Sequence, residues 1–160
     1  SHLIAERLGM AGSKTFMSDA MVHGEEYEPE ARSFFELVRD VDVEEVAFIT
    51  NDAGTAGLSP DGLYDDRRRG LEIKCPDPVT QIGWLRQGGL PDAHKGQVHW
   101  SMAICLIPWT FVSYCPGLEP LIVDVEPDGY TDKLKVAQQE FLQQLAEEYA
   151  PFHIEKRKAA

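Results

Sequence analysis

Three side chains with complementary chemistry stand close together in the middle of the sequence. Asp61 lies in the segment Ser59-Pro-Asp-Gly62, and Glu72 and Lys74 follow, two residues apart. Residues two apart on a strand share one face at a spacing of roughly 6.6 Å, so we expect Glu72 and Lys74 to project together while Ile73 points the other way. Two carboxylates can hold Mg²⁺ or Mn²⁺, and a lysine can position or deprotonate an attacking water. The pattern predicts phosphodiester hydrolysis, although a Glu-x-Lys pair also occurs on solvated surface hairpins.

The hydrophobic pattern predicts the elements that must position these residues. Helical spacing of apolar residues indicates a helix in two pieces over 15–40, interrupted at Gly24 and Pro29, and later helices over 91–104 and 130–149. Strand patterns cover 46–50, 57–64, 71–75, 109–114 and 120–125. The order is therefore one helix, three strands, a helix, two strands and a helix. Asp61, Glu72 and Lys74 are expected on a central β-meander.

Length and composition favour one globular domain. The chain has 160 residues, of which 43% are hydrophobic and 26% charged, and a chain of this size can bury a sizeable core without a disulfide or structural zinc. We expect a single domain over residues 1–160 with a frayed tail at 155–160. The longest apolar run, residues 102–109, is far shorter than the roughly 20 residues of a membrane-spanning helix.

The cysteines and the net charge narrow the class further. Cys75, Cys105 and Cys115 form no CxxC pair and are odd in number, which argues against a disulfide framework, a zinc ribbon or a four-thiolate iron–sulfur cluster and favours a reducing cytoplasm. The formal net charge of -12 argues against coating of nucleic acid by bulk charge. Abundant carboxylates nevertheless suit a divalent cation.

The motif and its flanking residues resemble a known family. The spacing of Pro60-Asp61 and Glu72-Ile-Lys74 matches the PD-(D/E)xK signature, and the words Gly-Leu-Ser-Pro-Asp-Gly-Leu and Leu-Glu-Ile-Lys-Cys-Pro resemble those of the YqaJ-type viral recombinase family. The upstream segment 24–32, the downstream Gln97-Val-His99 and the strand residues 111–116 also match in order and spacing. The resemblance implies an α/β fold with a restriction-endonuclease-like core, in which helices flank a mixed central sheet.

The resemblance implies a metal site built from carboxylates. Asp61 and Glu72 would be ligands shared by two metal ions, Mg²⁺ with Mn²⁺ as a substitute, and the backbone carbonyl of Ile73 would complete one shell. Glu28, on the upstream helix, would place a further carboxylate near the second metal. Lys74 would activate the water.

The same resemblance assigns two residues of the 91–104 helix to the catalytic site. Gln97 matches the family pattern, whereas His99 stands where the family commonly has glutamine and is therefore a departure. A neutral imidazole can hydrogen-bond a nucleophilic water; a structural role within the helix is the alternative for His99.

Contacts with DNA are also implied. Ser59 matches a hydroxyl near the terminal 5′ phosphate, and Met21 matches an apolar residue that wedges the DNA end, with core packing as its alternative. Arg67, Arg68 and Arg69 form a basic turn that can contact the DNA backbone, or can be a solvated turn half neutralised by flanking aspartates. The family has an N-terminal segment with an arginine that grips the 5′ phosphate, and the resemblance begins downstream of it. We therefore expect residues 1–160 to contain only part of the terminal-phosphate site.

The expected function is a Mg²⁺-dependent 5′-to-3′ exonuclease, phage or prophage encoded and cytoplasmic. It would digest one strand of linear double-stranded DNA, and the resemblance adds a homotrimeric ring and a single-strand annealing protein as partner in recombination. The alternatives are another PD-(D/E)xK nuclease, such as an endonuclease or a Cas4-like enzyme, and a non-catalytic protein that binds DNA ends. Missing cysteine ligands weaken the Cas4-like alternative, and the presence of all three signature side chains weakens the non-catalytic one.

Overall fold

The structure, a computed structural model, describes residues 19–51 and 54–150. The elements, in chain order, are α2 (Asp19–Arg39), β1 (Ile49–Thr50), β2 (Gly57–Leu58), β3 (Gly62–Tyr64), β4 (Arg69–Lys74), α3 (Pro78–Gln87), α4 (Asp92–Cys105), β5 (Trp109–Ser113), β6 (Leu121–Val125) and α5 (Gly129–Tyr149). One compact unit, Met17–Lys135, carries every element from α2 to β6 and the start of α5. No helix in the described ranges is long and apolar enough to cross a membrane.

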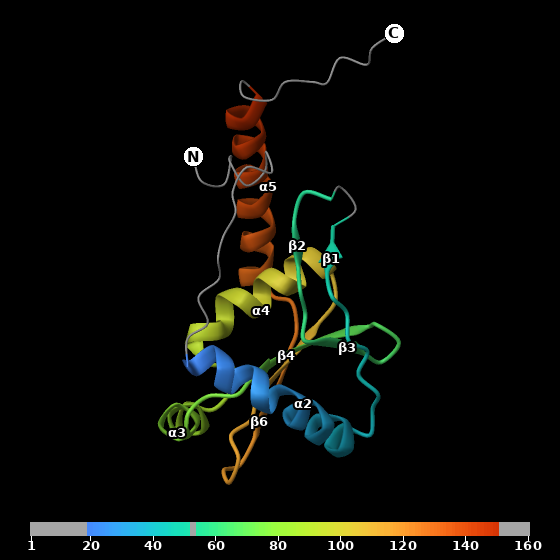
Figure 1. Ribbon diagram of the computed structural model, residues 1–160. Helices are drawn as coiled ribbons and strands as arrows, with labels where there is room; N and C mark the ends of the chain where they lie inside the picture. The colour runs from blue at the N-terminus through green and yellow to red at the C-terminus, as the bar shows by residue number, and fades with distance from the viewer. Residues whose placement is uncertain (1–18, 52–53, 151–160) are drawn as a thin grey trace. The chain divides into compact units, whose positions relative to one another are not determined.

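A four-stranded mixed sheet forms the centre of this unit, in the order β3-β4-β5-β6 (Figure 1). β4 pairs with β3 in antiparallel fashion and with β5 in parallel, and β5 pairs with β6 in antiparallel fashion. The parallel pair requires a long crossover, which α3 and α4 supply between β4 and β5. β1 and β2 form a separate two-stranded sheet. The predicted α/β class with a mixed sheet is confirmed.

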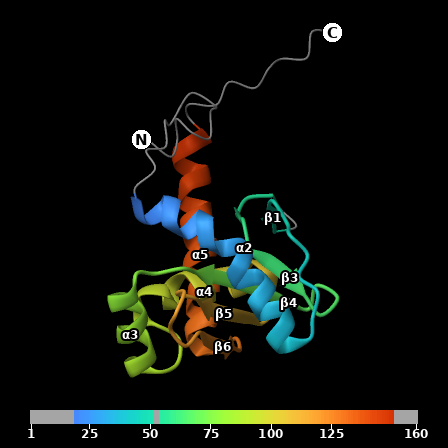
Figure 2. The ribbon, with the colours of Figure 1, turned by 60° about the horizontal axis from the view of Figure 1, so that its bottom comes forward.

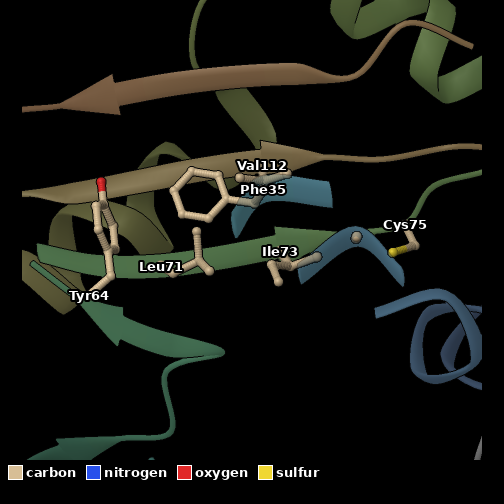
Figure 3. Close-up of a cluster of buried hydrophobic side chains, with 7 residues drawn as sticks. Phe35, Tyr64, Leu71, Ile73, Cys75 and Val112 are labelled. Carbon is tan, nitrogen blue, oxygen red and sulfur yellow. The ribbon is translucent and has the colours of Figure 1, made fainter. Parts of the chain in front are cut away.

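Helices cover both faces of the sheet. On one face, Ala31 and Phe35 of α2 pack against Leu71 and Ile73 of β4 (Figure 3). On the other face, α4 contributes Val98 and Met102, which pack against Trp109 and Phe111 of β5. Figure 2 shows α2 in front of the sheet strands and α3 at one end of them. Each face is thus closed by burial of apolar surface, the main stabilising contribution to such a core.

The predicted strand over 57–64 is divided in the structure. β2 ends at Leu58 and β3 begins at Gly62, and Pro60 lies in the break. A proline has no N–H to donate to a strand ladder, so regular pairing stops there. The break belongs to the segment that holds Asp61 and therefore matters for the site.

The helix predicted in two pieces over 15–40 is one continuous helix over its described part, and Pro29 lies inside it. The missing N–H of Pro29 would have bonded the carbonyl of Glu25, and both residues are exposed, so water can take that place. Residues 15–18 lie outside the described part of the chain. The predicted helices over 91–104 and 130–149 are confirmed as α4 and α5.

One helix was not predicted. α3 begins after Asp77, whose side chain accepts hydrogen bonds from the amides of Val79 and Thr80, and Pro78 takes the first helical position. An aspartate cap followed by proline is a recognised start signal. The helix carries no clear apolar stripe and contains Gly83, so its periodicity gave no indication. The cap sequence was the signal that could have revealed it.

Candidate active site

The break before β3 directs Asp61 toward β4. The backbone N–H of Asp61 bonds the carbonyl of Leu71 at 3.2 Å, and the backbone N–H of Ile73 donates to Oδ2 of Asp61 at 2.6 Å. The carboxylate therefore occupies a position where a regular strand would have placed a main-chain acceptor. Asp61 is fixed beside the strand that carries Glu72 and Lys74.

Glu72 is held from two sides. It is buried, with 3% of its surface exposed, although it is charged. Its Oε1 atom lies 2.5 Å from Nζ of Lys74 and accepts a hydrogen bond at 2.6 Å from Nε2 of Gln97 on α4. The predicted common orientation of Glu72 and Lys74 is present, and Gln97 joins them from the facing helix.

Glu28 approaches the same cluster from α2 and is paired with an arginine one turn later. Nη2 of Arg32 lies 2.6 Å from Oε1 of Glu28 and donates to the backbone carbonyl of Asp61 at 3.1 Å, while Nη1 lies 3.1 Å from Glu45. Arg32 thereby ties α2 to the loop that carries Asp61. Its spacing from Glu28, i to i+4, was the sequence signal for this pair.

The pKa values of the site residues are shifted because several carboxylates lie close together and are partly buried. Burial, together with the nearby Glu72 carboxylate, raises the pKa of Asp61 to about 6. Burial and the charge of Asp61 also raise the pKa of Glu28. Burial alone would lower the pKa of Lys74, but the charges of Glu72, Asp61 and Glu28 raise it overall. The cluster therefore holds excess negative charge that a cation would offset.

A cleft of about 580 Å³ opens beside these groups. Glu25 and Glu28 of α2 line one side, Asp61 and Lys74 lie at the sheet, and Trp84 of α3 lines another part of the wall. A smaller cavity of about 320 Å³ is lined by Arg32, Asp61 and neighbouring residues. Asp61 thus borders both cavities, and the larger one is wide enough to take part of a small organic molecule.

The donors present fit a divalent cation that keeps part of its water. In the described ranges no three His, Cys, Asp or Glu side chains converge as a closed metal site. Mg²⁺ needs no such cage, since one or two carboxylates with waters and substrate phosphates are its usual protein ligands. Asp61 and Glu72, two carboxylates whose charges repel each other in a buried setting, meet that requirement.

The structure does not bring His99 to Asp61 or Glu72; the carboxylate near its Nδ1, at 3.5 Å, is that of Asp128. His99 is buried, its Nδ1 lies 2.7 Å from the hydroxyl of Thr131, and its ring meets Tyr130 edge-on at 5.0 Å. Two residues along a helix correspond to a turn of about 200°, so Gln97 and His99 face different neighbours. We assign His99 to packing against the start of α5 and Gln97 to the carboxylate cluster.

The predicted arginine patch lies at the other end of the hairpin. Tyr64 pairs with Arg69 beside the β3–β4 turn, whereas Asp61 adjoins the opposite end of β3. Each arginine contacts a carboxylate: Arg67 contacts Glu44, Arg68 contacts Asp65 and Arg69 contacts Glu126. The structure therefore gives these side chains intramolecular partners and does not place them at the cleft.

For Ser59 and Met21, which were predicted to contact DNA, the structure gives a position in the fold but no side-chain contact. Ser59 is exposed and lies two residues before Asp61, but it does not line the cleft. Met21 belongs to the first turns of α2, and its side chain lies outside the described residues. Trp84 and Arg32 were missed: Arg32 had only its helical spacing to Glu28, and Trp84 gave no sequence signal because the helix that carries it was not predicted.

Together these features define a class of protein. A mixed sheet flanked by helices, with a buried and a half-buried carboxylate and a lysine beside a cleft, is the architecture of an α/β nuclease. The chain belongs to the YqaJ-like viral recombinase domain family, which matches residues 3–108. A comparison with curated proteins finds no match.

Solved structures agree with this assignment. The chain is similar to the alkaline exonuclease LHK-Exo from Laribacter hongkongensis, with 30% identity and a TM-score of 0.81, over 94% of this chain and 79% of that one. A structure of LHK-Exo in complex with dAMP matches at 30% identity and a TM-score of 0.80, over 94% and 80% of the two chains. A phage-related exonuclease from Haemophilus somnus 129PT shares the fold at 14% identity and a TM-score of 0.65, over 92% and 80%. The protein is a DNA nuclease of the phage exonuclease type.

Proposed function

We propose that the protein is a Mg²⁺-dependent exonuclease of the PD-(D/E)xK type that digests linear double-stranded DNA. It removes nucleotides from the 5′ end of one strand and leaves a 3′ single-stranded overhang for homologous recombination. The observation that carries the proposal is a pair of oriented carboxylates: Asp61 lines the cleft and is held by the Ile73 amide at 2.6 Å, and the buried Glu72 is held by Gln97 at 2.6 Å. The similarity to an alkaline exonuclease supports DNA as the substrate class.

The cation would be held by Asp61 and Glu72, with the Ile73 carbonyl and Glu28 as further oxygen donors. When bound, Mg²⁺ supplies Lewis-acid stabilisation of the charge that develops on the scissile phosphate, and Mn²⁺ can substitute for it. The number of ions, two, rests on the resemblance to the family.

The chain's own residues orient the reaction. Gln97 holds the Glu72 carboxylate through its amide, and Lys74 presents an ammonium group at the wall of the cleft. An ammonium can donate hydrogen bonds to a phosphate oxygen and to the attacking water. Arg32 fixes Glu28 and the Asp61 backbone in one unit, so that the carboxylates keep their spacing when DNA enters.

The proposal extends to assembly and surroundings. Three subunits that close head-to-tail would form a ring around DNA, and enclosure would retain the substrate despite a net charge of -12 per chain. Ser59 would contact the terminal 5′ phosphate. A single-strand annealing protein would take over the overhang, in the cytoplasm of a bacterial host that carries the phage or prophage.

Labelled duplexes test the function. Linear duplexes labelled at either the 5′ or the 3′ end and a closed circular duplex are incubated with wild type and with Glu72→Gln, in Mg²⁺ or in EDTA. Wild type is expected to release the 5′ label from linear DNA only, in Mg²⁺ only. Removing a metal ligand costs several kcal/mol of charge stabilisation, so Glu72→Gln is expected to lose about 100-fold or more in rate.

Each alternative has its own result in the same assay. Nicking or linearisation of the circle identifies an endonuclease, and release of the 3′ label first reverses the polarity. Binding of ends without any release of label in Mg²⁺ or Mn²⁺ identifies a non-catalytic protein. Light scattering that shows only monomer, together with digestion that stops at once on adding competitor DNA, rejects the ring and leaves the nuclease in place.

A further inference from the structure

Trp84 belongs to the core and to the cleft at once. On α3, it packs against the apolar cluster of Val98, Met102, Trp109 and Phe111. Its ring lies 5.0 Å from that of His94 at 90°, and 5.9 Å from that of Phe111 at 69°, measured between centroids. The same indole lines the cleft that Asp61 and Lys74 border. Two ring contacts therefore fix its orientation while part of its surface faces the cleft.

A purely structural tryptophan would have a different environment. Trp109, in the same cluster, is fully buried, whereas Trp84 is only half-buried. Trp84 lines the cleft together with Asp61 and Lys74, the groups that would act on a phosphodiester. Indole contributes little to binding a phosphate or a cation held by carboxylates, but its flat π-surface suits a nucleobase.

Charge also favours stacking over backbone contacts in this cleft. Glu25, Glu28 and Asp61 line it, with Lys74 as the basic side chain of the wall. Arg67, Arg68 and Arg69 contact carboxylates at the far end of the hairpin. A cation held at Asp61 would offset the charge for one phosphate, but the other carboxylates of the wall offer no contact to further phosphates, whereas stacking on an aromatic ring requires no charge and tolerates any base.

Resting on the proposed function, we propose that Trp84 is a stacking surface for the base of the nucleotide at the end of the strand being digested. The base would lie on the indole while its phosphodiester lies toward Asp61 and Lys74. Trp84 is thus a positioning residue for the substrate, and the enzyme is expected to prefer a terminal nucleotide that carries a base over a base-free one, without preferring a particular base.

A base-free end tests the proposal directly. Two duplexes are compared, one with an unpaired adenine at the 5′ end, opposite adenine, and one with a tetrahydrofuran residue in its place, so that neither end is paired. The measured quantity is kcat/KM for release of the first nucleotide in Mg²⁺. Wild type is expected to prefer the adenine end by about 10-fold, the size typical of one stacked base.

Variants connect the preference with the ring. Trp84→Leu keeps an apolar side chain against the core and removes the π-surface, so the preference is expected to fall close to 1. Trp84→Phe keeps a smaller ring and is expected to retain an intermediate preference. Ile82→Ala is the matched control, because Ile82 lies on the same helix, is 38% exposed and does not line the cleft; its preference is expected to equal that of wild type. Circular dichroism establishes that each variant is folded.

The outcomes separate this inference from the function it rests on. Equal kcat/KM for the two ends in wild type overturns the role of Trp84, and so does a folded Trp84→Leu that keeps the wild-type preference. Should Trp84→Leu fail to fold, the wild-type comparison and Trp84→Phe decide, and an unchanged preference in Trp84→Phe counts against the proposal. Absence of metal-dependent release from both duplexes and from ordinary DNA instead rejects the exonuclease function itself.

Discussion

The side-chain amide of Gln97 donates a hydrogen bond of 2.6 Å to Oε1 of Glu72, the same oxygen that lies 2.5 Å from Nζ of Lys74. A buried carboxylate on β4 is therefore oriented by a residue of α4 that comes 25 positions later in the chain. Removing a partner that orients a metal-ligating carboxylate typically costs about 10- to 100-fold in metal affinity or activity.

Replacing Gln97 is therefore expected to impair catalysis without unfolding the protein. Gln97→Leu removes the amide donor to Glu72, and kcat for release of the 5′ nucleotide is expected to fall about 10- to 100-fold. Gln87→Leu, at the exposed end of α3, serves as control and should retain the wild-type rate. Wild-type kcat in a folded Gln97→Leu would show that the contact does not orient Glu72.

Lys74 is expected to influence turnover more than metal affinity, because an ammonium cannot ligate a cation. Lys74→Met should lower kcat by about 100-fold while calorimetric titration with Mn²⁺ gives nearly the wild-type affinity. Lys74→Arg should not restore the rate fully, since the guanidinium differs in shape and in hydrogen-bond geometry. Lys95→Met, on the exposed side of α4, is the control; loss of Mn²⁺ binding with an unchanged rate in Lys74→Met would contradict the assignment.

His99 is expected to matter for stability and not for catalysis. Its Nδ1 contacts the hydroxyl of Thr131 at 2.7 Å, so His99→Asn should lower the free energy of unfolding by about 1–2 kcal/mol and the melting temperature by about 2–8 °C. The rate of nucleotide release should stay close to that of wild type, because the polar partners of His99 are Thr131 and Asp128 and not Asp61, Glu72 or Lys74. A much larger loss of rate in a folded His99→Asn variant would show that His99 has a catalytic role.

The pH dependence of this effect has a definite sign. Burial lowers the pKa of His99 below its ordinary value, so the unfolded chain takes up a proton before the folded protein does. The stabilising contribution of the neutral ring is therefore complete above about pH 6.5 and is lost as the pH falls below that value. The difference in melting temperature between wild type and His99→Asn should be larger at pH 8 than at pH 5.5, and a difference that grows on acidification would refute this assignment.

Gly70 is expected to be required where β4 meets β5. A Cβ at this position would lie 2.2 Å from two ring atoms of Trp109, which is fully buried. Gly70→Ala should lower the free energy of unfolding by about 1–3 kcal/mol because the ring has no room to move. Gly83→Ala is the matched control, because nothing lies within 4 Å of a Cβ added at this position. Within α3 the change should raise stability by up to about 1 kcal/mol. Equal melting temperatures for the two variants would contradict the packing argument.

Local patterns in the sequence were sufficient for much of the fold. Alternation at Leu71, Glu72 and Ile73 predicted a strand with one face in the core and the other carrying the catalytic candidates. In the structure Leu71 and Ile73 lie in the core with Phe35. The long helical patterns of α4 and α5 also appear where expected, because periodic burial over three or more turns is a strong signal. α3 was missed, since a short helix without an apolar stripe is indicated by its cap alone.

The tertiary structure decided which candidate residues meet. Residue types and spacing identified Asp61, Glu72 and Lys74, because neighbouring strands and a two-residue repeat leave few possible arrangements. The sequence marked His99 as a departure from the family pattern but left its role open, and the structure pairs Gln97 with Glu72 and His99 with Thr131. The pairing of Arg67 with Glu44 and of Arg69 with Glu126, and the two-sided position of Trp84, likewise depend on contacts between elements far apart in the chain, which local patterns do not encode.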